Sequence, residues 1–154
     1  MTLALLASLL CFAAVPAAAA EVSDWDALSA ALAAGGDVVL TADVTAPEAR
    51  TCILEVPAGV TASLDLNGFT LDGGTPGEED CVVRVYGAFT LSDSSAAGTG
   101  SVTGTRDAVD IFDGGSLTMT GGTVDGCGNY GVCAEDSTVT MTGGALRGCG
   151  VADA

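Results

Sequence analysis

Carboxylates, guanidinium groups, hydroxyls and thiols are the side chains of this 154-residue chain that could take part in chemistry. The chain has 20 acidic residues, four arginines and six cysteines but no lysine or histidine, and its formal net charge is −16. The absence of histidine excludes a histidine-based triad and a histidine-ligated metal, and the absence of lysine excludes a Schiff base and a P-loop. Several large classes of enzyme are therefore ruled out.

The charge balance also limits the partners that the chain could bind. Nucleic acids and anionic membranes are recognised by clustered lysines and arginines, whereas the basic residues here are few and scattered. They are Arg50, Arg84, Arg106 and Arg147. We therefore expect no nucleic-acid partner.

Three charged residues occupy equivalent positions in short apolar segments that recur along the chain. Glu55, Arg84 and Asp110 are predicted to form one outward ladder with a strand spacing of about 4.8 Å. The simplest interpretation is a row of surface ion pairs. Alternatively, the two acids lie two strands apart, within the roughly 6.5 to 9.5 Å of an inverting glycosidase. Because Arg84 between them should keep both acids ionised, we assign no catalytic residue.

Two aromatic residues lie beside this ladder. Tyr86 and Phe112 each follow a predicted inward residue in neighbouring strands, so their rings could stack on a sugar while Arg84 and Asp110 bind its hydroxyl groups. The alternative is that both rings pack on the nearby loop 73–80. The candidate glycan-binding residues are thus Arg84, Tyr86, Asp110 and Phe112.

The cysteines suggest two pairs. Cys52 and Cys81 share one predicted column on adjacent coils, and Cys127 and Cys149 lie 22 residues apart in the same turn of a repeat. Stacking in adjacent strands suits the Cα separation of a disulfide, although side chains that point in parallel make the dihedral angle of the S–S bond awkward. For Cys52 and Cys81, a stack of two reduced thiols in the core is an equal alternative. Neither pair has Cys-x-x-Cys spacing, and the acidic loops lack a calcium pattern, so we expect no metal and no cofactor.

Repeats indicate which elements would position these residues. The segment 116–128 returns at 138–150, and looser copies precede it, with period-two alternation typical of short strands. Units that cannot bury their inner face alone must stack, which predicts an all-β parallel solenoid with three strands per coil and about four coils. The predicted inward columns are Val56/Val85/Ile111/Ala134, Leu66/Leu91/Met119/Met141 and Leu71/Val102/Val124/Leu146.

These repeats resemble a known fold family. Leu64–Leu71, Thr90–Ser95 and the Leu-Thr-Met-Thr-Gly-Gly copies are similar to repeats of the right-handed parallel β-helix of pectate-lyase-like type, found in large secreted or wall-attached proteins of gut bacteria. The resemblance covers nearly all of 22–150. It implies a right-handed β-helix, a surface protein of adhesin-like type, and an N-terminal helix that plugs the first coil. The fold also hosts polysaccharide lyases and glycosidases.

The two ends of the chain have different patterns. Residues 1–20 form an apolar run with a small-residue end, which predicts a secretory signal peptide cleaved before Glu21. A capping helix is expected within 21–36, with Trp25 buried over the first coil, and β-helix repeats within 37–154. The last copy stops in a turn with no capping unit, so we expect truncation at the C-terminus and concentration-dependent association.

Together these patterns predict a secreted, extracellular or cell-surface β-helix module that is adhesin-like, binds extracellular glycans or a host surface, and is not catalytic. No segment after the signal peptide is long and apolar enough to span a membrane. The alternative function is a polysaccharide lyase or glycoside hydrolase of the same fold.

Overall fold

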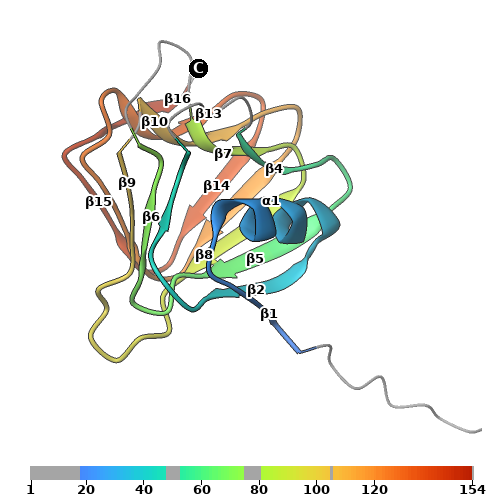
Figure 1. Ribbon diagram of the computed structural model, residues 1–154. Coiled ribbons are helices and arrows are strands. Elements are labelled where there is room, and N and C mark those ends of the chain that lie inside the picture. The colour runs from blue at the N-terminus through green and yellow to red at the C-terminus, as the bar shows by residue number, and fades with distance from the viewer. Residues whose placement is uncertain (1–17, 48–52, 75–80, 105, 154) are drawn as a thin grey trace, which may run out of the picture.

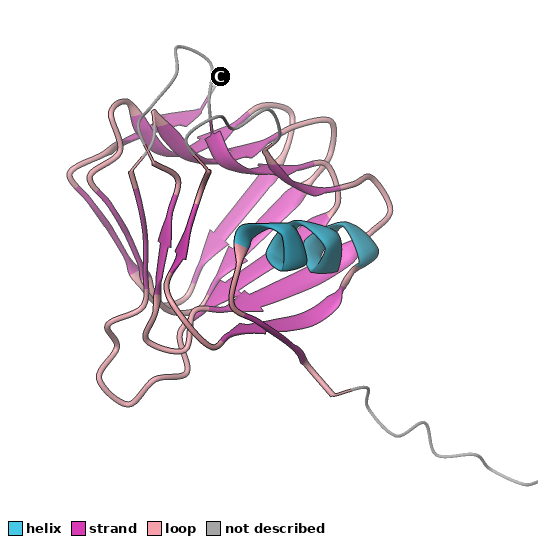
Figure 2. Cartoon of the chain, in the orientation of Figure 1, coloured by secondary structure: helices cyan, strands magenta, loops and turns pink. Residues whose placement is uncertain are grey.

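The chain forms a parallel β-helix of about four turns, closed at one end by a helix (Figure 1). The computed structural model describes residues 18–47, 53–74, 81–104 and 106–153. Three parallel sheets form the walls, and every pair of neighbouring strands in them is parallel. Figure 2 shows the strands arranged around a common interior. The predicted all-β solenoid with three strands per coil is confirmed.

Each sheet takes one strand from each turn of the chain. The first sheet contains β1 (Ala20–Val22), β2 (Gly36–Leu40), β5 (Thr61–Asp65), β8 (Ala88–Ser92), β11 (Ser116–Met119) and β14 (Thr138–Met141). The second contains β3 (Val44–Thr45), β6 (Thr70–Asp72), β9 (Ser101–Thr103), β12 (Thr123–Asp125) and β15 (Ala145–Arg147). The third contains β4 (Leu54–Val56), β7 (Cys81–Val85), β10 (Asp107–Ile111), β13 (Tyr130–Ala134) and β16 (Gly150–Asp153).

Two of the three predicted inward columns have the expected register, and the third contains an error. In the first sheet, Leu91 pairs with Leu64 rather than with the expected Leu66. A shift of two residues preserves the alternation of faces, so the apolar pattern could not distinguish the two registers. Leu66 is buried at the corner beyond β5, where a Cβ on Gly100 would lie 2.6 Å from the Leu66 Cβ. That corner requires a glycine.

Aspartates brace the corners between the first and second sheets. Asp43 accepts a hydrogen bond from Thr70 N, and Asp65 accepts one from Ser94 N, both at 2.8 Å. Asp93 accepts hydrogen bonds from Gly68 N and Gly100 N at 2.8 and 2.7 Å. Each of these carboxylates bridges to another coil or closes its own turn, so part of the acidic excess has a structural role.

The single described helix, α1 (Trp25–Ala34), covers the first coil. Asp24 caps it by accepting a hydrogen bond from Ala27 N at 2.9 Å, and Gly35 ends it with a φ of 84°. Trp25, Leu28 and Leu32 are buried in the common core, and the helix contacts β2, β4 and β5. The predicted helix, its apolar stripe and the burial of Trp25 are confirmed.

The two ends of the described chain differ in how well they are covered. Residues 1–17 lie outside the described part, and β1 begins at Ala20, one residue before the predicted cleavage point. At the other end, Val139 and Met141 are 39% and 43% exposed although they continue inward columns. The buried core therefore extends from α1 to β13, with Val132 still fully buried, and opens at β14.

Candidate functional site

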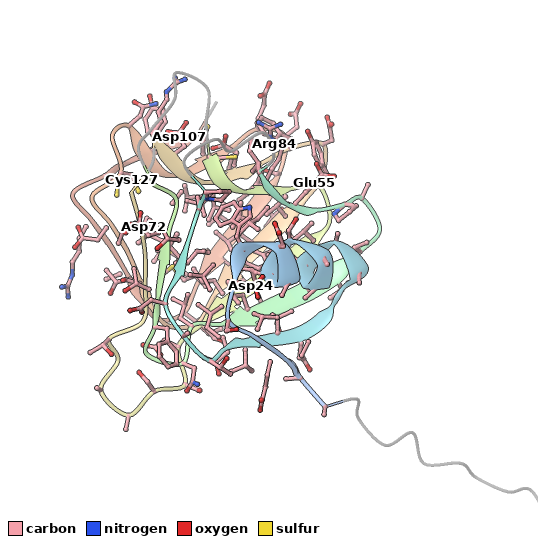
Figure 3. The ribbon with its side chains drawn as sticks, viewed as in Figure 1. Asp24, Glu55, Asp72, Arg84, Asp107 and Cys127 are labelled. Carbon is pink, nitrogen blue, oxygen red and sulfur yellow. The ribbon has the colours of Figure 1, made fainter. Side chains whose placement is uncertain are left out.

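The outer face of the third sheet carries the predicted charged ladder. Strand register places Arg84 between Glu55 on β4 and Asp110 on β10, and Cys133 on β13 continues the row. Glu55 and Arg84 lie along the same wall of the β-helix in Figure 3. Glu55 is exposed, Arg84 is half-buried and Asp110 is only 9% exposed. The ladder thus passes from solvent into a buried environment within three strands.

Burial dominates the electrostatics at Asp110. It raises the pKa of the Asp110 carboxyl, and the nearby charge of Asp107 raises that pKa further. The Cys81 hydrogen bond and the charges of Arg84 and Arg106 oppose the increase without cancelling it. Arg84 therefore does not lower the pKa of Asp110 below its ordinary value, because desolvation of the carboxylate outweighs the attraction of the arginine, while the expectation that both acids stay ionised is still a prediction.

Cys81 belongs to this cluster rather than to an apolar column alone. Period-two alternation predicts an inward side chain at this position, yet the Cys81 thiol forms side-chain hydrogen bonds with Asp110 and Arg84. Burial, followed by the charge of Asp110, raises the pKa of Cys81 to about 12. The thiol stays protonated at neutral pH and serves as a hydrogen-bond donor to the carboxylate.

The two aromatic residues are neighbours, as their spacing predicted. The ring centroids of Tyr86 and Phe112 are 5.9 Å apart and the ring planes are tilted by 33°. The Arg84 Cζ lies 6.0 Å from the centroid of the Phe112 ring, within the range of a cation–π contact. Both rings are partly exposed. Arg84, Tyr86 and Phe112 thus gather on one surface, hereafter called the aromatic ladder face. The fourth predicted residue, Asp110, pairs with Arg84 in register but is buried, so it offers a ligand little of its carboxyl group.

Sequence reasoning missed Asp107 as a part of this region. Asp107 is buried, accepts a hydrogen bond from Tyr130 N at 2.9 Å, and lies 3.9 Å from Arg106 Nε. Its strand pairs it with Cys81 in β7. The repeat could have indicated Asp107, because Asp107 and Cys81 occupy the same position at the start of neighbouring strands.

The predicted cysteine pairs have different outcomes. Cys127 and Cys149 lie in adjacent coils as unbonded thiols, with Cys127 N donating a hydrogen bond to Cys149 Sγ at 3.3 Å. Cys52 lies outside the described residues, so the pair with Cys81 stays a prediction. Residues 75–80 of loop 73–80, the alternative packing partner of the aromatic residues, also lie outside them, so that alternative stays untested.

Comparisons with known proteins give the chain no family. No protein-family model, no curated protein and no solved structure matches it. Within the described ranges, no three His, Cys, Asp or Glu residues are grouped so that they could hold a metal ion. The described part of the chain also contains no helix with the length and apolar character needed to cross a membrane.

Proposed function

We propose that this chain is a glycan-binding module that uses the aromatic ladder face and carries out no catalysis. The observation that carries the proposal is the Tyr86–Phe112 pair with Arg84 over one ring, set on a regular parallel sheet. Partly exposed aromatic rings bind the C–H faces of sugars, and neighbouring charged groups bind the hydroxyls. Because the chain carries a net charge of −16, neutral glycans are better ligands than polyanionic ones.

The proposed setting is extracellular. We place the protein on the surface of a bacterium or free outside it, as an adhesin-like β-helix of pectate-lyase-like type that contacts extracellular glycans or a host surface. The apolar run at 1–20 and the resemblance of the repeats support this setting. The parallel three-sheet architecture is compatible with it.

Glycan binding is tested by removing the rings. Tyr86→Ala with Phe112→Ala should abolish retention on any neutral glycan that the wild-type chain binds on an array, while far-ultraviolet circular dichroism stays unchanged. Thr90→Ala with Thr118→Ala, on the outer positions of the first sheet, is the matched control and should retain binding. Equal retention by the ring variant would remove this face from consideration.

Glycoside hydrolysis is the second candidate, and one observation favours it. Asp110 has a raised pKa, as a general acid needs, and Glu55 stands two strands away in the same row. Burial of Asp110 at 9% exposure weighs against direct contact with a substrate. A reducing-end assay on neutral polysaccharides separates the two functions, because activity that is lost in both Asp110→Asn and Glu55→Gln would replace the binding proposal. A polyuronide assay for unsaturated products tests a lyase in the same way.

A further inference from the structure

Two thiols stack at the turn that leads from the second sheet to the third. Asp125 on β12 pairs with Arg147 on β15, and Cys127 and Cys149 each follow two residues later. Cys127 N donates a hydrogen bond to Cys149 Sγ at 3.3 Å, and Gly126 N donates one to Arg147 O at 3.1 Å. The Cys149 thiol donates a hydrogen bond to Arg147 O at 3.0 Å, and the Cys127 thiol points toward Asp125 O at 4.0 Å. The Cys149 sulfur therefore lies directly against the backbone of Cys127 in the preceding coil.

We propose that Cys127 and Cys149 are an oxidation site, at which the two thiols form a disulfide that fastens the last coil, β14 to β16, to the preceding one. The two turns are stacked, since a Cβ on Gly148 would lie 3.7 Å from Gly126 Cα. Stacking at about the 4.8 Å spacing of strands suits the range of about 4.4 to 6.8 Å between Cα atoms that a disulfide requires. The last coil is also the one that gains most from a covalent link, because its inward residues Val139 and Met141 are substantially exposed.

The pairing is specific among the described cysteines. Cys133 pairs in register with Asp110 and Ala152, and Cys81 pairs with Asp107, so neither meets a cysteine in the adjacent described strands. Cys81 and Cys133 lie on strands separated by β10, at about twice the strand spacing, which is too far for a disulfide. A Cβ on Gly131 would lie 3.3 Å from Cys149 Cβ, so the glycine leaves room for the Cys149 side chain.

Thiol–disulfide exchange with a small disulfide such as oxidised glutathione supplies the oxidant. Cys149, the more exposed thiol, attacks one sulfur of the reagent as its thiolate, forms a mixed disulfide and releases one glutathione thiol. Cys127 then attacks Cys149 Sγ and releases the second glutathione. The two protein thiols lose two electrons and two protons, and one glutathione disulfide becomes two thiols. Burial raises the pKa of Cys127 to about 12, which favours Cys149 as the first nucleophile.

Peptide mapping of the wild-type chain tests the bond directly. The reduced full chain is incubated with oxidised glutathione, its remaining thiols are blocked, and it is digested with trypsin without reduction. Cleavage after Arg147 separates peptide 107–147, with Cys127 and Cys133, from peptide 148–154, with Cys149. We expect these two peptides to be cross-linked within one chain, and chymotryptic cleavage after Tyr130 should assign the link to Cys127. The proposal would be overturned if Cys149 were recovered entirely with its thiol blocked, or if it were linked only to a cysteine of another chain.

Single variants test the order of attack. Cys127→Ser should accumulate glutathione on Cys149, whereas Cys149→Ser should leave Cys127 largely unmodified. Cys133→Ser is the matched control and should form the cross-link as the wild-type chain does. A cross-link that persists in Cys127→Ser and disappears in Cys133→Ser would contradict the assignment. In the wild-type chain, oxidation should slow hydrogen exchange at 138–146 by about 300-fold, the change expected from closing a loop of this length.

Discussion

The local surroundings of Asp110 and Asp93 shift the pKa values of these two aspartates in opposite directions. At Asp110 burial and Asp107 together raise the pKa, despite the arginine next to it. At Asp93 burial also raises the pKa, but hydrogen bonds from Gly100, Ser95 and Gly68 outweigh burial, and the net result is a lowered pKa. The opposite pKa shifts follow from the number of N–H groups that donate hydrogen bonds to each carboxylate.

The pH dependence of stability should therefore differ between these two residues. Because the folded state holds the proton on Asp110 more tightly, the free energy of unfolding falls as pH rises from about 4 through the raised pKa. Asp110→Asn should remove this fall, so its stability relative to wild type should increase between about pH 4 and pH 7. Urea denaturation across that range measures the difference. Asp113→Asn at an exposed turn is the control, and a pH-independent difference for Asp110→Asn would contradict the prediction.

Asp93 should contribute stability through its hydrogen bonds. Asp93→Ala leaves the N–H groups of Gly68 and Gly100 without their acceptor, so we expect a loss of about 1 to 2 kcal/mol in the free energy of unfolding. The folded pKa of Asp93 is lowered, so this contribution should be present above about pH 4 and disappear as pH falls through the folded value. Ser94→Ala in the same turn, where the side chain is exposed, should cost less than about 0.5 kcal/mol.

Among the strands, register was predictable where copies of the repeat are nearly identical. The copies 116–128 and 138–150 aligned Leu117 with Val139 and Val124 with Leu146, as the structure has them. The earlier coils are longer, since Leu64, Leu91 and Met119 are separated by 27 and 28 residues rather than 22. Extra residues at corners allowed the two-residue error at Leu66. Contacts made by the first residue of a strand, such as that of the Cys81 thiol with Asp110, do not follow from period-two alternation.

Helix α1 should contribute to stability mainly through its buried stripe. Leu28 is fully buried, so Leu28→Ala should lower the free energy of unfolding by about 3 kcal/mol and loosen the packing around Trp25. Trp25 is the only tryptophan, and its emission reports both effects in a urea titration. The control Ala30→Ser, on the exposed side of the same helix, should cost about 0.5 kcal/mol or less. If Leu28→Ala cost no more than Ala30→Ser does, the helix would add little packing energy and the prediction would be wrong.

At the scale of the whole molecule, stability should decrease along the solenoid because each coil packs only on its neighbours. Met119 and Met141 occupy the same inward column, but β11 has described strands on both sides and β14 has one. Met119 is fully buried and Met141 is 43% exposed. The same change of side chain therefore removes very different amounts of packing at the two positions.

Met119→Ala should cost about 3 kcal/mol in the free energy of unfolding, whereas Met141→Ala should cost less than about 1 kcal/mol. The pair Leu117→Ala and Val139→Ala provides an independent comparison at the neighbouring inward column, with the same expected order, because Leu117 is buried and Val139 is exposed. Urea denaturation at low protein concentration measures all four variants. Equal losses at Met119 and Met141 would mean that β14 is covered in solution, since a methionine that is truly half-exposed cannot contribute as much packing energy as a fully buried one.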